Sequence, residues 1–401
     1  MVNLIATMRS ILLTLAMWLT GLPLATQSPP SNSPSLLWSV DIPHDPRMLP
    51  RDNVYPRSVS SRNGVTFLDD QRLLVHDVIF DNHRLSSRES PDISSSFRLQ
   101  VSVFDAKSGK SLLTREWGTR AHESSIQSTS GGLVVQTGEI LRFLSKDLTE
   151  QKEVLMREMA EHSDEHWSEA VISVSPSRRT FMINRFNQGA NVSRLDVFDG
   201  DTFQERLSWI ESPPLYHSYS ISDNGIVAVK MPEQKGILYA EFGGVKWRPL
   251  ADAHDGACDL RSSFTGLLTF SSNEQLLIGA GGQTCVSDTH GHSEALPNIE
   301  GPTICASRAP FNEKIATSQD GRFIAISLAQ VKIKKHTFAE ASQTLLRRCV
   351  DVYDLSARKW LATIDLTPLP KNDYDFALSP DGSKLAILND LKVSVYSVPA
   401  R

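Results

Sequence analysis

A chain of 401 residues with a formal net charge of −5 is long enough for one large domain or several average ones. Hydrophobic residues make up 40% of it and charged residues 22%, which are ordinary values for a folded globular protein. A mildly acidic chain lacks the strong basic footprint that general nucleic-acid binding requires. We therefore expect no nucleic-acid partner.

Residues 1–27 have the anatomy of a secretory signal peptide. Arg9 is the only charged residue before Asp41, and it precedes an apolar run that ends at Gly21. This run of about 14 residues is shorter than the roughly 20 that span a bilayer. The pattern therefore favours a cleaved signal over the alternative, an uncleaved membrane anchor.

Cleavage is expected between Ala25 and Gln27, which would remove Arg9 and take the net charge from −5 to −6. The mature chain would then have no transmembrane anchor. Residues 28–35 are rich in Ser and Pro and offer nothing to bury, so they are expected to form a disordered spacer. We predict an exported protein, periplasmic or extracellular, with one domain over residues 36–401.

A tight turn between two apolar segments recurs along the chain. Its best copy is Ser379-Pro380-Asp381-Gly382, in which Pro and Asp suit the early positions and Gly suits the position with positive φ. Degenerate copies begin at Leu68, Ser130, Ser175, Ser222, Ser271 and Ser318. The steps between copies are 62, 45, 47, 49, 47 and 61 residues. The two long steps therefore each contain an insertion of about 15 residues on a shorter basic period.

A second pattern follows each turn, an apolar–x–apolar–aromatic segment typical of a strand with period 2. Clear copies are 101–105, 195–199 and 350–354; looser ones are 141–144, 237–240, 284–288 and 393–396. Two patterns in phase seven times indicate seven copies of one antiparallel unit. The chain here resembles the bacterial exported β-propellers built from Ser-Pro-Asp-Gly repeats, of the WD-repeat or YVTN type. The resemblance covers about residues 36–398 and implies an all-β, seven-bladed β-propeller with four-stranded blades.

Several copies continue into a fourth strand that contains Trp, at Trp117, Trp209, Trp247 and Trp360. The last copy ends at its third strand, and residues 35–42 match the strand at 359–366 almost position for position. We therefore predict that an N-terminal strand closes the last blade, which protects edges that would otherwise invite aggregation.

Both insertions fall between the second and third strands, over residues 81–97 and 329–348. In a propeller these loops and the blade-to-blade links share one face, called the top, so we predict that this face is the recognition surface. The second insertion is basic and suits a protein or other anionic partner. Its recognition residues would be Lys332, Lys334, Lys335, His336, Arg347 and Arg348. The alternative is a solvated loop or a short helix packed on the propeller.

Four cysteines in an exported chain suggest two disulfides. Cys258 and Cys305 lie in blade-to-blade links, and Cys285 and Cys349 open the third strands of the same two copies. This placement predicts the pairs Cys258–Cys285 and Cys305–Cys349, with the other two connectivities left open.

No catalytic motif stands out. His290 and His292 lie in a polar turn, and His162 and His166 are not in the His-Glu-x-x-His order of zinc peptidases, so we predict no metal, cofactor or catalytic residue. The preferred function is a monomeric, non-enzymatic binding or scaffold module. The alternative is a propeller hydrolase, a lactonase or a quinoprotein-like oxidoreductase, whose channel residues would converge from distant parts of the sequence.

Overall fold

The computed structural model describes residues 34–42, 63–80, 97–119, 124–138, 140–155, 167–187, 190–211, 219–231, 236–240, 248–249, 265–271, 274–280, 283–288, 293–295, 311–335, 341–370, 374–390 and 392–399. All of these belong to the compact unit Pro34–Arg401. Within these ranges there is no helix long and apolar enough to cross a membrane. The predicted signal peptide, most of the spacer, Cys258, Cys305, Trp247 and His336 lie outside them.

Every sheet in the described part of the chain has four strands, and all pairings are antiparallel. Sheets 1 to 3 hold β2 (Asn63–Phe67), β3 (Arg72–Phe80), β4 (Phe97–Asp105) and β5 (Ser111–Thr119); β6 (Ser124–Ser128), β7 (Gly132–Thr137), β8 (Ile140–Ser145) and β9 (Glu150–Leu155); and β10 (Trp167–Val174), β11 (Thr180–Asn187), β12 (Val192–Asp199) and β13 (Glu205–Glu211). Sheets 4 and 5 hold β14 (Tyr219–Ile221), β15 (Val227–Met231), β16 (Gly236–Ala240) and β17 (Arg248–Pro249); and β18 (Thr265–Phe270), β19 (Leu276–Ala280), β20 (Gln283–Ser287) and β21 (Ser293–Ala295). Sheets 6 and 7 hold β22 (Phe311–Thr317), β23 (Phe323–Lys335), β24 (Ala341–Asp354) and β25 (Lys359–Asp365); and β26 (Tyr374–Leu378), β27 (Lys384–Asn389), β28 (Lys392–Ser397) and β1 (Leu36–Asp41).

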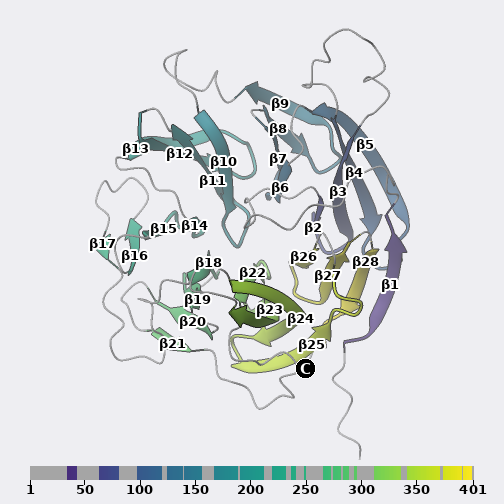
Figure 1. Ribbon diagram of the computed structural model, residues 1–401. Coiled ribbons are helices and arrows are strands. Elements are labelled where there is room, and N and C mark those ends of the chain that lie inside the picture. Colours follow the sequence, from purple (N-terminus) through teal and green to yellow (C-terminus); the bar gives the residue numbers. More distant parts are fainter. Residues whose placement is uncertain are drawn as a thin grey trace, which may run out of the picture. The chain divides into compact units, whose positions relative to one another are not determined.

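The sheets follow one another in a closed cycle (Figure 1). The first strand of each sheet contacts the first strand of the next, in the order β2, β6, β10, β14, β18, β22 and β26, and β26 contacts β2 in turn. Clusters of buried apolar side chains lie between neighbouring sheets, as between sheets 7 and 1 and between sheets 1 and 2. Burial of both faces of each sheet explains why the inner strands carry continuous apolar runs rather than a strict alternation.

The predicted closing strand is confirmed: β1 pairs with β28, the last strand of the chain, although the two lie at opposite ends of the sequence (Figure 1). Ser397 N–H donates to the Ser35 carbonyl over 2.9 Å, so pairing begins within the segment expected to be spacer. Trp38 lies against Gly109 of sheet 1 and donates from Nε1 to the Ala106 carbonyl over 2.9 Å. Closure therefore binds sheet 7 to sheet 1 as well as adding a strand.

The insertion at 329–348 differs from the loop expected there. β23 and β24 pair continuously from Phe323↔Asp354 to Lys335↔Ala341, whereas β22 reaches only Ala329 and β25 only Cys349. The extra residues of the two strands pair with each other and form a two-stranded ribbon, which we call the sheet 6 ribbon. Apolar and β-branched residues alternating with lysine in Val331-Lys332-Ile333-Lys334 favour this extension of the strand.

Candidate functional site

The repeated turn lies between the first and second strands of each sheet, and its chemistry repeats. Ser379 Oγ accepts the Lys384 N–H, and Ser318 Oγ accepts the Phe323 N–H, each over 2.9 Å. Gly382 has a φ of +71°, and Arg178 holds a φ of +65° at the matching position of sheet 3. A non-glycine residue rarely adopts this conformation, so the surroundings of Arg178 must hold it there.

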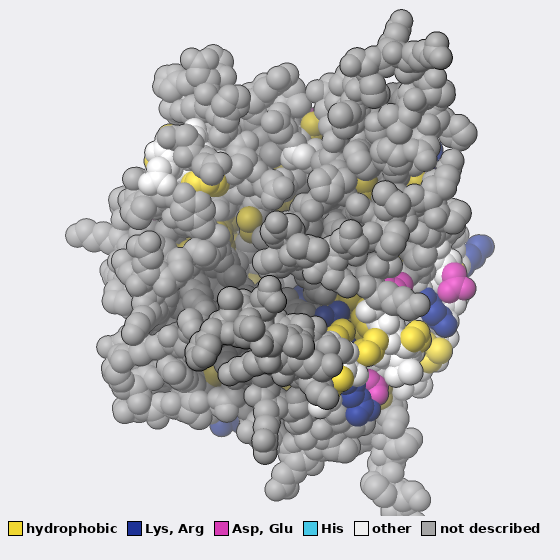
Figure 2. Space-filling view, in the orientation of Figure 1, with side chains coloured by type: hydrophobic (Ala, Val, Ile, Leu, Met, Phe, Trp, Pro, Cys, Tyr) yellow, Lys and Arg dark blue, Asp and Glu magenta, His cyan; other side chains and the backbone are white. Residues whose placement is uncertain are grey.

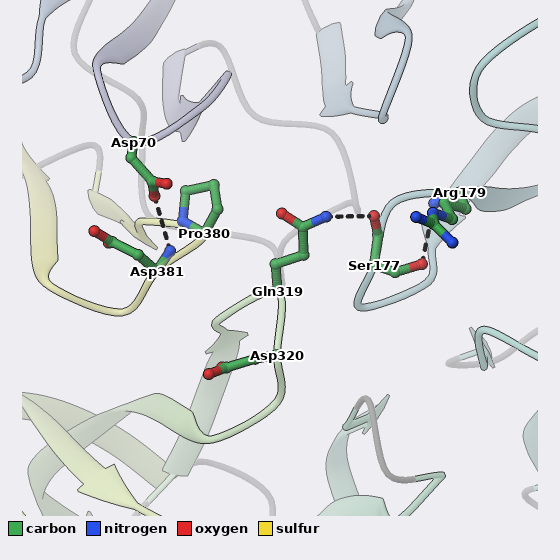
Figure 3. Close-up of a pocket in the computed structure, with 7 residues that line it drawn as sticks. All are labelled: Asp70, Ser177, Arg179, Gln319, Asp320, Pro380 and Asp381. Carbon is green, nitrogen blue, oxygen red and sulfur yellow. Dashed lines mark hydrogen bonds between the residues drawn. The ribbon is translucent and has the colours of Figure 1, made fainter.

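A pocket of about 330 Å³ opens where turns of sheets 1, 3, 6 and 7 meet (Figure 3). The residues that line it are Asp70, Ser177, Arg179, Gln319, Asp320, Pro380 and Asp381. Six of the seven are polar, and three are carboxylates. We call this the mouth pocket.

Hydrogen bonds between sheets fix the walls of the mouth pocket. Gln319 Nε2 donates to the Ser177 carbonyl over 3.1 Å, and its backbone N–H donates to the Pro380 carbonyl over 2.7 Å. Asp381 N–H donates to Asp70 Oδ1 over 2.8 Å. Figure 3 shows Gln319 lying between the turn of Pro380 and Asp381 and the turn of Ser177. The four turns are therefore joined to one another and hold the pocket rigidly.

Arg178 crosses the centre of the same set of turns. Its Nη1 donates over 2.7 Å to the Phe67 carbonyl of sheet 1 and over 2.7 Å to Ser128 Oγ of sheet 2. Burial lowers the pKa of its guanidinium to about 10, and the nearby Asp70 opposes that shift. The charge is kept at neutral pH, so Arg178 ties three sheets together through charge-assisted hydrogen bonds.

The two neighbouring carboxylates of the pocket differ in their electrostatics. Burial raises the pKa of Asp70, and the nearby Asp381 carboxylate adds to that shift. Burial acts in the same direction on Asp381, but hydrogen bonds from Ser379 and Ser383 and the charge of Lys384 outweigh it and lower its pKa. The mouth therefore carries negative charge that is partly offset by Arg179 and Lys384.

The structure places the described residues of the predicted basic loop on the two paired strands β23 and β24. Lys332, Lys334 and Lys335 lie on β23, and Arg347 and Arg348 lie on β24. Arg347 is paired with Asp365, its Nε lying 3.0 Å from Oδ2, and Arg348 is 5% exposed and stacks on the Tyr374 ring. The two arginines are therefore committed to the fold of sheets 6 and 7.

Cys285 on β20 and Cys349 on β24 are both fully buried, and each is disulfide-bonded. No cysteine among the described residues is free. Because Cys258 and Cys305 lie outside these residues, the pairing stays a prediction.

Sequence reasoning used the turn residues as a marker of the repeat and missed them as a site. Six of the seven lining residues lie at the second or third turn position of four copies, and Arg179 lies two residues after Ser177. Superimposing the repeat on a closed cycle was the one signal that could have brought them together. The mouth pocket lies at the end of the sheets opposite the predicted top face, because the first-to-second turns and second-to-third connections of an antiparallel sheet occupy opposite ends. No cluster of three or more metal-binding side chains occurs in the described segments.

Comparisons with known proteins find a similar fold but no matching family. No protein-family model matches the chain, and no curated protein matches it in sequence. Among solved structures, the WD40 domain of Neurospora crassa Pan2 is similar with a TM-score of 0.51 and 10% identity, over 92% of this chain and 97% of that one. The fold is that of a WD40-like β-propeller.

A chain in a mitotic checkpoint complex gives a TM-score of 0.49 at 11% identity, over 92% of this chain and 93% of that one. With this TM-score, the second structure is a likeness that supports no argument. At these identities the comparison with Pan2 establishes the fold alone, and the site must be read from the geometry of this chain.

Proposed function

We propose that the chain is an exported, non-enzymatic propeller that serves as a protein-binding scaffold. The observation that carries this proposal is the mouth pocket, whose walls come from four sheets and are fixed by Gln319, Arg178 and the Asp381–Asp70 contact. A pocket that does not rearrange costs little ordering entropy when a partner binds, which favours recognition by a rigid surface.

The lining suits an amphipathic or basic segment of a protein partner. It presents the carboxylates of Asp70, Asp320 and Asp381 beside the backbone edges of turns. Such groups accept hydrogen bonds from backbone amides and from cationic side chains. The likeness to a WD40 domain is compatible with a protein-binding scaffold, and we propose that the end with the mouth pocket is its binding platform.

The sheet 6 ribbon is the second surface of the proposal, at the opposite end of the sheets. Arg347 is paired with Asp365 and Arg348 is buried, so these two residues contribute to the fold. For an anionic partner the proposal therefore relies on the predicted residues Lys332, Lys334 and Lys335 of β23. Leu346, which precedes Arg347 on β24, is 47% exposed. On the described surface, Figure 2 shows hydrophobic side chains intermixed with basic and acidic ones near β1 and β28. We propose that this ribbon adds affinity and that the mouth pocket provides the main contact.

Site-specific photo-crosslinking in the native host tests which end binds. Benzoylphenylalanine in place of Arg179 or Gln319 is expected to yield the same covalent partner, identified by mass spectrometry. Leu112, which is 50% exposed on β5, is the matched control and should yield none. Partners captured only from Lys334 would move the main contact to the ribbon. Equal yields from all positions, or none from any, would remove the support for a scaffold.

Export and the disulfides are tested together on the protein recovered from the envelope or medium. The proposal expects a mature N-terminus between residues 25 and 28, and non-reduced peptides that join Cys258 to Cys285 and Cys305 to Cys349. A peptide joining Cys285 to Cys305 would overturn the pairing. Recovery of the chain with Met1 intact in the cytoplasm would overturn export.

A further inference from the structure

A buried histidine lies on β3 of sheet 1, beside Asp375 of sheet 7, near the end of the sheets opposite the mouth pocket. It is on the face of β3 from which Leu74 and Val78 pack towards sheet 2. The contact of β2 with β26 next to it is here called the seam. His76 on β3 is 5% exposed, and neither ring nitrogen has a hydrogen-bond partner among the described residues. Its ring lies against Gly64 of β2 so closely that a Cβ at residue 64 would be 2.5 Å from His76 Cε1. The ring is therefore fixed by packing and not by hydrogen bonds.

Asp375 of β26 lies beside this ring and joins three sheets. Its Oδ2 accepts the Val65 N–H over 2.9 Å, and its Oδ1 accepts from Lys314 Nζ of β22 over 2.5 Å. The Cβ position of residue 64 is 3.0 Å from Asp375 Oδ2 and 3.2 Å from His76 Nε2, so both groups lie next to Gly64. The carboxylate that ties sheets 6, 7 and 1 together therefore adjoins an imidazole that has no hydrogen-bond partner within the described ranges.

We propose that this seam is an acid-sensitive latch, in which protonation of His76 opens the contact between β2 and β26. A charged imidazole buried without a hydrogen-bond partner is strongly disfavoured, so the protonated ring needs water. Separation of β2 from β26 withdraws Asp375 and lets water reach the ring from that side. Separation breaks the bond of Asp375 to Val65, which is one of the contacts that close the cycle of sheets.

The charges around His76 come from several elements. Asp375 from β26 favours the protonated ring, and Lys314 from β22 opposes it. On the side of sheet 2, Arg142 of β8 lies on the face that packs against sheet 1, where Thr137 and Glu153 hold it. Asp375 and Lys314 act on the ring in opposite directions, and burial outweighs both. The charge of Arg142 is paired with that of Glu153.

Burial, the largest cause, lowers the pKa of His76 to about 4 from 6.5. The closed seam therefore has its full stability at pH values above 6.5, the ordinary pKa of histidine. It loses stability relative to the open seam as the pH falls from 6.5 towards 4. If the ring regains its ordinary pKa in the open seam, the open population rises about 60-fold between pH 7 and pH 4.5.

Hydrogen exchange measured by mass spectrometry tests the latch, with rates corrected for the pH dependence of chemical exchange. Peptides from residues 63–80 and 374–389 are expected to lose protection by about that factor between pH 7 and pH 4.5. Residues 167–211 contain no histidine and serve as the internal control. The variant His76→Gln should abolish the pH dependence in the seam. Lys314→Met, which removes an opposing charge from a side chain that is 40% exposed, should reduce it.

If His76→Gln does not fold, the NMR titration of the histidine ring protons in the unmodified chain decides the question. The latch requires one histidine that titrates well below pH 6. Seam peptides that keep their protection at pH 4.5, or that lose it in parallel with residues 167–211, would overturn the proposal.

Discussion

The variant Trp38→Ala is expected to lower the free energy of unfolding by about 2–4 kcal/mol. The indole is half-buried, packs on the apolar cluster between sheets 7 and 1, and has its ring centroid 6.2 Å from that of Phe104. Its hydrogen bond to the Ala106 carbonyl is lost as well, which adds about 1 kcal/mol to the loss of apolar burial. Alanine would leave Gly109 facing a cavity.

The loss should be local to the closing strand, because Trp38 is the main side chain by which β1 contacts sheet 1. Urea unfolding gives the free energy, and hydrogen exchange of residues 36–41 and 392–397 shows where protection is lost. Trp209→Ala is the matched control, since Trp209 is also half-buried on a fourth strand and its Nε1 bonds Glu211 over 3.0 Å. Loss of protection over β1 in both variants alike would contradict a special role of Trp38 in closure.

Much of the fold could be predicted because its signals are local. A turn such as Ser379–Gly382 is specified by a few consecutive residues, and the strand after it by alternation over five or six more. Trp38 could be placed on a closing strand because its neighbours repeat the pattern around Trp360. The predicted third strands lie on β4, β8, β12, β16, β20, β24 and β28.

The sites could not be predicted, because their residues carry no local signature. His76 and Asp375 meet only after the cycle of sheets closes, and nothing in the sequence around either one indicates the other as its neighbour. The ribbon residues show the opposite difficulty: Arg347 and Arg348 read as a solvated basic patch, yet Asp365 and Tyr374 from other strands bind them. Charge along the sequence predicts a surface only where folding does not bring a partner.

Removing the guanidinium in Arg185→Met is expected to destabilise the chain by about 3 kcal/mol or more. Arg185 on β11 and Asp196 on β12 are both 0% exposed, and Arg185 Nε lies 3.0 Å from Asp196 Oδ2. Without Arg185, the buried Asp196 carboxylate keeps Arg194 and Ser208 as partners on Oδ1. The other oxygen then lacks the cation that offsets its desolvation.

The double variant Arg185→Met with Asp196→Leu separates the cost of an unpaired charge from the value of the pair. Apolar replacement of both partners is often neutral, because the desolvation of two ions is avoided together with their attraction. We expect the double variant to recover most of the stability in urea unfolding, since Arg194, 13% exposed, can then turn to solvent. A double variant as unstable as Arg185→Met would show that the pair itself stabilises sheet 3. In that case the buried ion pair would add to the stability that the β11–β12 backbone ladder and the packing around it provide.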